Sequence, residues 1–158
     1  MIVIFDLDDT LFDTTGQLDE LYTHLPNIIP FPDTVSTLRQ LNAIKILVSR
    51  GDQKIQLEKI KILGIKKYFS DIFICETAEE KKDVFERIVK KYKVNPKDVW
   101  VVGDRINVEI RYGNMLGMNT VHFHHGKHKD LKPQDALDKP MHTITKLNEL
   151  CRFIPCRQ

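Results

Sequence analysis

The feature that most constrains this chain is a short run near its start that is apolar on both faces and ends abruptly in acids. Residues Ile2 to Phe5 are all β-branched or aromatic. Such a run is typical of a central parallel strand that helices cover on both sides. Asp6 ends the run, and further acids follow it closely, at Asp8, Asp9 and Asp13. Because open α/β sheets bind ligands at the carboxyl ends of their strands, these acids predict a ligand site there.

The rest of the chain alternates between strand-like and helix-like segments. Further strands are predicted at residues 44–48, 72–75, 99–102 and 120–123. Helices are predicted around 18–25, 34–41, 53–63 and 81–92, with another that ends near 116 and a last one at 146–153. A loop is expected at 124–140, followed by a short apolar piece near Ile144.

These repeated β–α units predict an α/β fold, with a doubly wound parallel sheet and helices on both faces. No internal repeat or linker interrupts the sequence, so residues 1–158 are expected to form one domain.

Composition narrows the class of protein. The chain has 158 residues, of which 42% are hydrophobic, and its net charge is +2. This charge is too small to indicate a nucleic-acid-binding surface. No apolar run is long enough for a transmembrane helix or a signal peptide, so no membrane partner is expected. The three cysteines, Cys75, Cys151 and Cys156, show neither a paired framework nor zinc spacing, so a reduced, cytoplasmic protein is expected.

Polar residues also follow the second and the fourth predicted strands. Another polar residue begins the helix that precedes the fourth strand. Ser49, Arg50 and Gly51 end the second strand, where a hydroxyl and backbone N–H groups could hold a phosphate oxygen. The same triplet is compatible with an ordinary turn. Lys81, at the start of a helix, could neutralise a carboxylate and a phosphate, or could serve as a solubilising charge. Asp104 follows the fourth strand after a glycine.

Together these positions resemble the motifs of the haloacid dehalogenase-like (HAD) hydrolases. Asp-x-Asp-x-Thr directly after a strand is similar to the first motif of that superfamily. It is followed, in the superfamily's order, by a Ser at the end of the second strand, a helix-starting Lys and a Gly-Asp pair. The matching residues here are Asp6, Asp8 and Thr10, then Ser49, then Lys81, and finally Gly103 and Asp104.

Two positions match the motifs of the superfamily less simply: the lysine that starts the helix, and the acid five residues after Asp104. Relatives often place the lysine four residues before the first large apolar residue of the helix, here Phe85, which favours Lys81 over the alternative, Lys82. The superfamily usually has a second Asp five residues after the first, where this chain has Glu109. This departure leaves open how Lys81, or the outer shell of a metal, is held.

The resemblance implies a Mg²⁺-dependent phosphatase. It implies that the carboxylates of Asp6 and Asp104 and the backbone carbonyl of Asp8 bind Mg²⁺. Asp6 is then the nucleophile that forms an aspartyl-phosphate, and Asp8 is the acid that protonates the leaving oxygen and later the base that activates water. Lys81 is the third catalytic residue implied. The residues implied to bind the substrate are Thr10, Ser49, Arg50 and Gly51.

The branch of the superfamily follows from Asp8 and from the room left for a cap. Dehalogenase members lack the second aspartate of the first motif, so Asp8 favours the phosphatases. Only about residues 14–31 are available for a cap, and their apolar stripe, Leu18, Leu21, Tyr22 and Leu25, is too small to enclose a substrate. We therefore expect a nearly cap-less phosphatase that acts on a small phosphorylated metabolite. A homo-oligomer, in which a second subunit completes the pocket, is also expected. The alternatives are a macromolecular substrate, such as a phosphoprotein or a nucleic-acid end, and a non-catalytic or receiver-like phosphorylatable binding domain.

Four histidines are bunched near the predicted fifth strand, at His122, His124, His125 and His128. Imidazole suits several transition metals, so a second metal site is one interpretation. No neighbouring cysteine or carboxylate in the sequence completes a known ligand pattern, which favours a polar surface loop.

Overall fold

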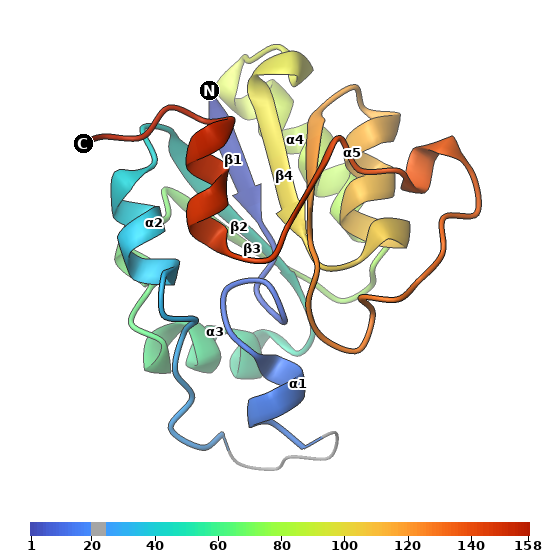
Figure 1. The fold of residues 1–158 in the computed structure, drawn as a ribbon. Coiled ribbons are helices and arrows are strands. Elements are labelled where there is room, and N and C mark those ends of the chain that lie inside the picture. The colour runs from blue at the N-terminus through green and yellow to red at the C-terminus, as the bar shows by residue number, and fades with distance from the viewer. Residues whose placement is uncertain (20–24) are drawn as a thin grey trace.

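A parallel sheet of six strands runs through the described residues, 1–19 and 25–158, of the computed structural model (Figure 1). The strand order is β3-β2-β1-β4-β5-β6. The strands are β1 (Ile2–Phe5), β2 (Ile44–Arg50), β3 (Asp71–Cys75), β4 (Val99–Gly103), β5 (Asn119–Phe123) and β6 (His142–Ile144). Chain order reverses between β1 and β4, and doubly wound sheets bind ligands at such a switch point. The predicted α/β fold is confirmed.

Strand β1 lies inside the sheet, between β2 and β4, and each of its residues is at most 1% exposed. Val3 and Phe5 belong to one apolar cluster, and Ile2 and Ile4 belong to the other. Because side chains alternate between the two faces of a strand, β1 is covered on both faces. This burial explains why the run is apolar at every position.

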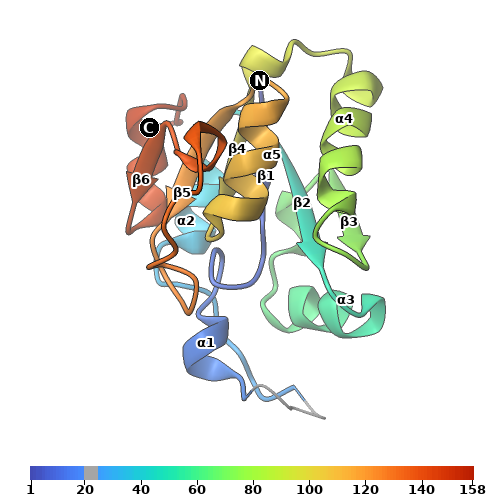
Figure 2. The ribbon, with the colours of Figure 1, turned by 90° about the vertical axis from the view of Figure 1, so that its right-hand side faces the viewer.

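Helices cover both faces of the sheet (Figures 1 and 2). On one face lie α2 (Thr34–Gln40), α3 (Gln53–Ile62) and the 3₁₀ turns at Leu147–Arg152. On the other face lie α4 (Glu80–Tyr92) and α5 (Arg111–Met115). Shorter 3₁₀ turns are present at Lys66–Tyr68, Pro96–Asp98 and Ala136–Asp138. Among the described residues, no helix combines the length and the apolar character that a membrane span requires.

Three segments in the second half of the chain differ from the prediction. The helix expected to end near residue 116 is a π-helical turn at Ile106–Ile110 that leads directly into α5. The apolar piece near Ile144 is a strand, β6, which pairs with β5 at the edge of the sheet. Residues 146–153 form 3₁₀ turns in place of the expected helix.

Most of the helix predicted around 18–25 lies outside the described residues, and a short helix is present just before it. Helix α1 (Thr14–Gln17) ends before Leu18, whose backbone is extended. The Asp13 carboxylate accepts the Gly16 N–H at 2.8 Å, and this cap starts the helix at Thr14. Leu21 and Tyr22 lie outside the described residues. The apolar stripe that includes them, together with the small cap and the homo-oligomer inferred from it, therefore stays a prediction.

The expected reduced state is wrong for two of the three cysteines. Cys151 and Cys156 form a disulfide, with their Cα atoms 5.5 Å apart. The C-terminal segment lies against α2 and the residues after it, because the Arg157 N–H donates to the Gln40 carbonyl at 2.7 Å and Cys156 forms a β-bridge with Leu41. These two contacts hold Cys156 and Arg157 beside α2, where the chain turns back so that the sulfurs of Cys151 and Cys156 meet. Cys75 is buried and unpaired, as expected.

Candidate active site

The acids after β1 and β4 meet at the switch point of the sheet. Phe5 and Val102 are partners in the β1–β4 pairing, and the Asp6 N–H donates to the Val102 carbonyl at 3.0 Å. Asp6 and Asp104 therefore leave their strands side by side, and they are 7% and 3% exposed. Carboxylate oxygens of Asp6, Asp104 and Glu109 all lie within 4.8 Å of one another. The structure thus brings together the acids at the ends of the first and fourth strands.

Lys81 is the cation of this acidic centre. Its Nζ lies 2.7 Å from Asp6 Oδ1 and 2.6 Å from Glu109 Oε1, and the lysine is 3% exposed. Lys82 points elsewhere and pairs with Glu86 at 3.0 Å near the surface. Successive positions of a helix point about 100° apart, so only one of the two lysines can reach the strand ends. Burial opposes the charge of Lys81, but the contacts with Asp6 and Glu109 raise its pKa above the usual value.

Glu109, which stands where the superfamily usually has an Asp, contacts Lys81 from the π-helical turn. Its Oε1 accepts from Lys81, and its Oε2 accepts the backbone N–H of Arg105 at 3.3 Å. The side chain lies directly against Gly103, where a Cβ atom would collide with it. The absence of a side chain at Gly103 therefore leaves the space that Glu109 occupies.

The buried carboxylates outnumber the cation that faces them. Burial is the largest cause that raises the pKa of Asp6 to about 6, with Glu109 and Asp8 adding to it and Lys81 opposing it. The pKa of Asp104 is raised to about 10, chiefly by burial and then by the charges of Asp6 and Glu109. A divalent cation would relieve this repulsion, and Mg²⁺ prefers such oxygen ligands. The donor set therefore fits Mg²⁺.

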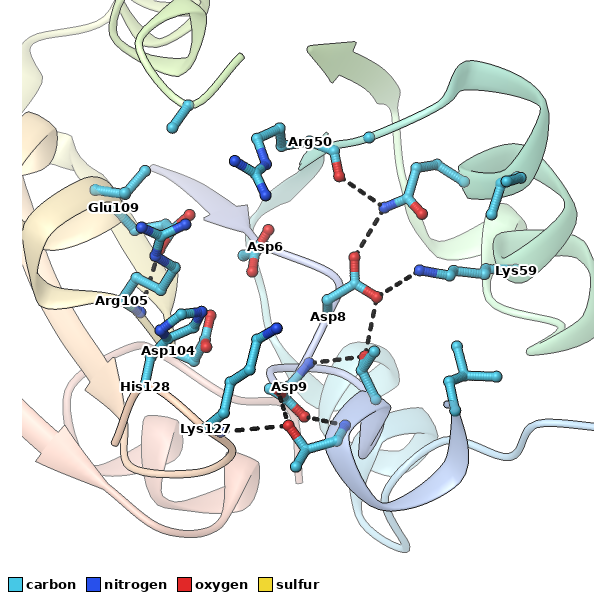
Figure 3. A pocket seen from close by; sticks show the side chains of 18 of the residues that line it. Asp6, Asp8, Asp9, Arg50, Lys59, Asp104, Arg105, Glu109, Lys127 and His128 are labelled. Atoms are coloured by element: carbon cyan, nitrogen blue, oxygen red, sulfur yellow. Dashed lines mark hydrogen bonds and ion pairs between the residues drawn. The ribbon is translucent and has the colours of Figure 1, made fainter. Parts of the chain in front are cut away.

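Asp8 is held by side chains from α1 and α3 (Figure 3). Its Oδ1 accepts from Thr14 Oγ1 at 2.9 Å and from Lys59 Nζ at 2.7 Å. Its Oδ2 accepts from Gln56 Nε2 at 2.8 Å. Gln56 and Lys59 are 2% and 3% exposed, so α3 presents two polar side chains on its buried face. Sequence analysis missed both, because their position three residues apart becomes informative only when the buried face of the helix is known.

The four residues implied to bind substrate occupy different depths. Thr10 and Ser49 are fully buried, whereas Arg50 and Gly51 line the cleft above the acids. Ser49 Oγ accepts from Gln56 Nε2 at 2.6 Å. The Gly51 N–H donates to the Cys75 carbonyl at 2.9 Å, so it is engaged in the sheet and is not the open phosphate donor that we expected. The roles of these four residues in binding stay predictions.

The cleft over the acids has a volume of about 750 Å³. Asp6, Asp8 and Asp104 lie toward its centre in Figure 3. Its walls come from the loops after the first five strands, β1 to β5, which all leave the same edge of the sheet. The cationic residues among these walls are Arg50, Lys59, Lys81, Arg105 and Lys127, with His128 beside them.

The histidines make separate contacts, and His122 is not on a surface loop. It is buried at 6% exposure on β5, and its Nε2 lies 3.0 Å from the Asp104 carbonyl. Burial lowers its pKa, so the neutral ring donates this hydrogen bond. His125 Nε2 lies 2.8 Å from Asp13 Oδ1. His125, Asp13 and Asp9 form a second group of possible metal ligands, but both Asp9 oxygens already accept hydrogen bonds from Thr15, at 2.9 and 2.7 Å.

Comparison with known proteins agrees with this geometry. The family model described as haloacid dehalogenase-like hydrolase matches residues 25–117. The protein named glyceraldehyde 3-phosphate phosphatase from Methanopyrus kandleri is 33% identical over 127 residues, which cover 77% of this chain and 54% of that protein. Its namesake from Methanocaldococcus jannaschii is 29% identical over 147 residues, which cover 89% of this chain and 63% of that protein. The chain thus spans between half and two thirds of the length of these relatives.

Solved structures share the fold. A Listeria monocytogenes protein titled as uncharacterized superposes with a TM-score of 0.76 at 16% identity, covering 96% of this chain and 95% of that one. A Bacillus subtilis protein titled as a HAD-hydrolase, bound to magnesium, gives a TM-score of 0.72 at 15% identity, with 96% of each chain covered. With the matched family model extending over more than half of its residues, the chain belongs to the haloacid dehalogenase-like hydrolase family.

Proposed function

We propose that this chain is a Mg²⁺-dependent phosphatase that hydrolyses the phosphate monoester of a small metabolite through an aspartyl-phosphate. The observation that carries the proposal is the buried contact of Lys81 with Asp6, next to Asp104 at the switch point of the sheet. A lysine there can neutralise both a nucleophilic carboxylate and an arriving phosphate. The relatives named glyceraldehyde 3-phosphate phosphatase support a small phosphorylated substrate.

The residues that would hold Mg²⁺ are the Asp6 and Asp104 carboxylates and the Asp8 backbone carbonyl. The buried, closely spaced oxygens of Asp6 and Asp104 favour this assignment. When bound, Mg²⁺ supplies positive charge that reduces the repulsion between the phosphate and the acids.

The bond changes then follow from the positions of Asp6 and Asp8. An Asp6 carboxylate oxygen attacks phosphorus, the bond to the ester oxygen breaks, and Asp8 gives that oxygen a proton. In the second half, Asp8 takes a proton from water as the water oxygen attacks phosphorus. This step releases inorganic phosphate and restores the Asp6 carboxylate. Lys81 balances the charge of Asp6 and of the transferring group throughout.

Asp8 must change partners to perform this role. Both of its oxygens accept hydrogen bonds, and one of the donors is the Lys59 ammonium group, so Asp8 is a carboxylate in this arrangement. To deliver a proton it must be protonated and must turn from α3 toward the leaving oxygen. Lys59 and Gln56 therefore define the resting position of the acid–base residue.

The decisive experiment compares the wild-type protein with Asp6→Asn on p-nitrophenyl phosphate. With Mg²⁺ present, we expect phosphate release by the wild type, loss of release with a chelator, and recovery when Mg²⁺ is returned. Asp6→Asn removes the nucleophile with little change in shape and is expected to lower turnover at least about 10³-fold. Acid-quenched wild type should carry a covalent phosphate. The exposed Asp130→Asn is the control. Full activity of Asp6→Asn would refute the mechanism.

A further inference from the structure

Two arginines in the walls of the cleft have no acidic partner among the described residues. Arg50 ends β2, Arg105 follows β4, and both line the cleft. Three of the acids that line the cleft contact other cations: Asp6 and Glu109 contact Lys81, and Asp8 contacts Lys59. Resting on the proposed function, we propose that Arg50 and Arg105 bind a second anionic group of the substrate. The substrate would then be a small phosphate monoester that also carries a carboxylate or a second phosphate.

Arg105 is fixed in place but has an unused donor. Its backbone N–H donates to Glu109 Oε2, which ties the residue to the acidic centre. Its side chain is half-buried, and the buried Nε has no hydrogen-bond acceptor in the part of the chain that the structure describes. Buried donors are normally paired, because an unpaired one loses its hydration without compensation. An anion placed against this guanidinium could supply the missing acceptor after a small rotation of the side chain.

Two further basic residues share the wall of the cleft with Arg105. Lys127 and His128, from the loop after β5, line the same cleft. Burial lowers the pKa of His128, and the positive charges of Arg105 and Lys127 lower it further, against the opposing effect of Asp9 and Glu109. Figure 3 shows Arg105 and His128 on the same side of the acids, and Arg50 on another side above Asp6. Cations from three loops therefore surround the space above the nucleophile.

The chemistry of guanidinium distinguishes between substrate classes. The transferring phosphoryl group already has Lys81 and the proposed Mg²⁺ to balance its charge. A guanidinium binds carboxylate or phosphate through paired, charge-assisted hydrogen bonds, whereas an aldehyde or a hydroxyl offers no negative charge to it. The cleft volume of about 750 Å³ leaves room beyond one phosphate for such a group. Two arginines without a salt bridge to any described acid therefore favour an anionic second group over a neutral one.

The test uses phosphates that differ in one group only. For a carboxylate, we would compare 3-phosphoglycerate with glyceraldehyde 3-phosphate and glycerol 3-phosphate, which share its three-carbon skeleton. For a second phosphate, we would compare fructose 1,6-bisphosphate with fructose 6-phosphate. In at least one of the two series, kcat/KM for the doubly anionic member is expected to be at least about tenfold higher, the scale of one hydrogen bond to a charged group.

The variants Arg50→Gln and Arg105→Gln assign the preference to the arginines. Each is expected to lower kcat/KM for the preferred anionic substrate at least about tenfold, and by a smaller factor for p-nitrophenyl phosphate. The exposed Lys129→Gln, which also removes one positive charge, is the control and should change neither value. Equal losses on all substrates would overturn the inference, because the arginines would then bind the transferred phosphate. Hydrolysis without preference in either series would also overturn it, whereas no hydrolysis of any phosphate would refute the proposed function itself.

Discussion

At the scale of single residues, the charge of Lys81 is central to the site. Its ammonium group contacts two buried carboxylates, those of Asp6 and Glu109. Removing one partner of a buried ion pair leaves the other as an uncompensated charge, which typically costs about 3–5 kcal/mol. A change at Lys81 is therefore expected to affect both stability and turnover.

We predict that Lys81→Ala lowers turnover at least about 10²-fold and reduces the free energy of unfolding by roughly 3 kcal/mol. The neighbouring Lys82→Ala is the matched control, because its partner Glu86 lies near the surface and such pairs contribute less than about 1 kcal/mol. Phosphate release and chemical denaturation measure the two quantities. The opposite ranking of the two variants would show that Lys81 is not the lysine of the site.

Lys59 acts on the reaction through Asp8. We predict that Lys59→Met, which keeps much of the side-chain volume, lowers kcat about tenfold or more and leaves KM within a factor of about three. The reason is that Asp8 loses the charged partner that sets its position. Lys61→Met, on an exposed position of the same helix, is the control. A change in KM alone would instead place Lys59 in substrate binding.

These residues also show what the sequence could reveal at this scale. Asp6 and Asp104 were predictable because each follows an apolar strand directly, and parallel strands end at one edge of the sheet. Lys59 and Gln56 were not, because their meeting with Asp8 spans about 50 residues of sequence and depends on how α3 is rotated. The availability of the Gly51 N–H was misjudged because its use by Cys75 depends on pairing with β3.

At the scale of elements, the connection from β4 to α5 shapes the site. A π-helical turn at Ile106–Ile110 carries Glu109 back over the end of β4, where it lies against Gly103. Periodicity predicted a helix here but not its wider first turn, which depends on tertiary contacts. Strands β1 to β5 were predicted well because each one is an apolar run in the sequence, and pairing in the sheet does not change its bounds much. Strand β6 was missed because three residues at a sheet edge, only Ile144 fully buried, give almost no pattern.

We predict that Gly103→Ala disturbs this connection. The added Cβ would collide with the Glu109 side chain, and inserting a methyl group into a packed site typically costs about 1–3 kcal/mol. Glu109 would be displaced from Lys81, so turnover should fall together with stability. Thermal unfolding and phosphate release check both effects. A variant as stable and active as the wild type would mean that Glu109 can hold Lys81 from another position.

At the scale of the whole molecule, the order of the strands alone determines where the site lies in the sheet. The switch point lies between β1 and β4, and loops from five strands line the cleft. The doubly wound sheet was predictable from repeated β–α units. The disulfide between Cys151 and Cys156 was not, because it depends on the return of the chain end against α2.

The proposed Mg²⁺ is expected to stabilise the folded protein as well as to take part in catalysis. The buried acids repel one another in the metal-free protein, since burial and mutual proximity disfavour their charged forms. An ion that binds only the folded state stabilises it by mass action, by about 2.7 kcal/mol when its free concentration is a hundred times Kd. Addition of Mg²⁺ should therefore raise the melting temperature of the wild type.

Asp104→Asn separates the effect of this acid on the stability of the metal-free protein from its effect on Mg²⁺ binding. The amide cannot ionise, whereas the Asp104 carboxyl must bind a proton to stay buried without metal, so the metal-free variant is expected to be more stable than the metal-free wild type, by roughly 1 kcal/mol. It also removes a ligand, so Mg²⁺ should no longer raise the melting temperature. The exposed Asp130→Asn should keep the full response. Calorimetric titration with Mg²⁺ checks binding without any measurement of activity. An Asp104→Asn protein that Mg²⁺ stabilises as strongly as the wild type would mean that the ion binds elsewhere, and the acids at the switch point would then have to be balanced by Lys81 alone.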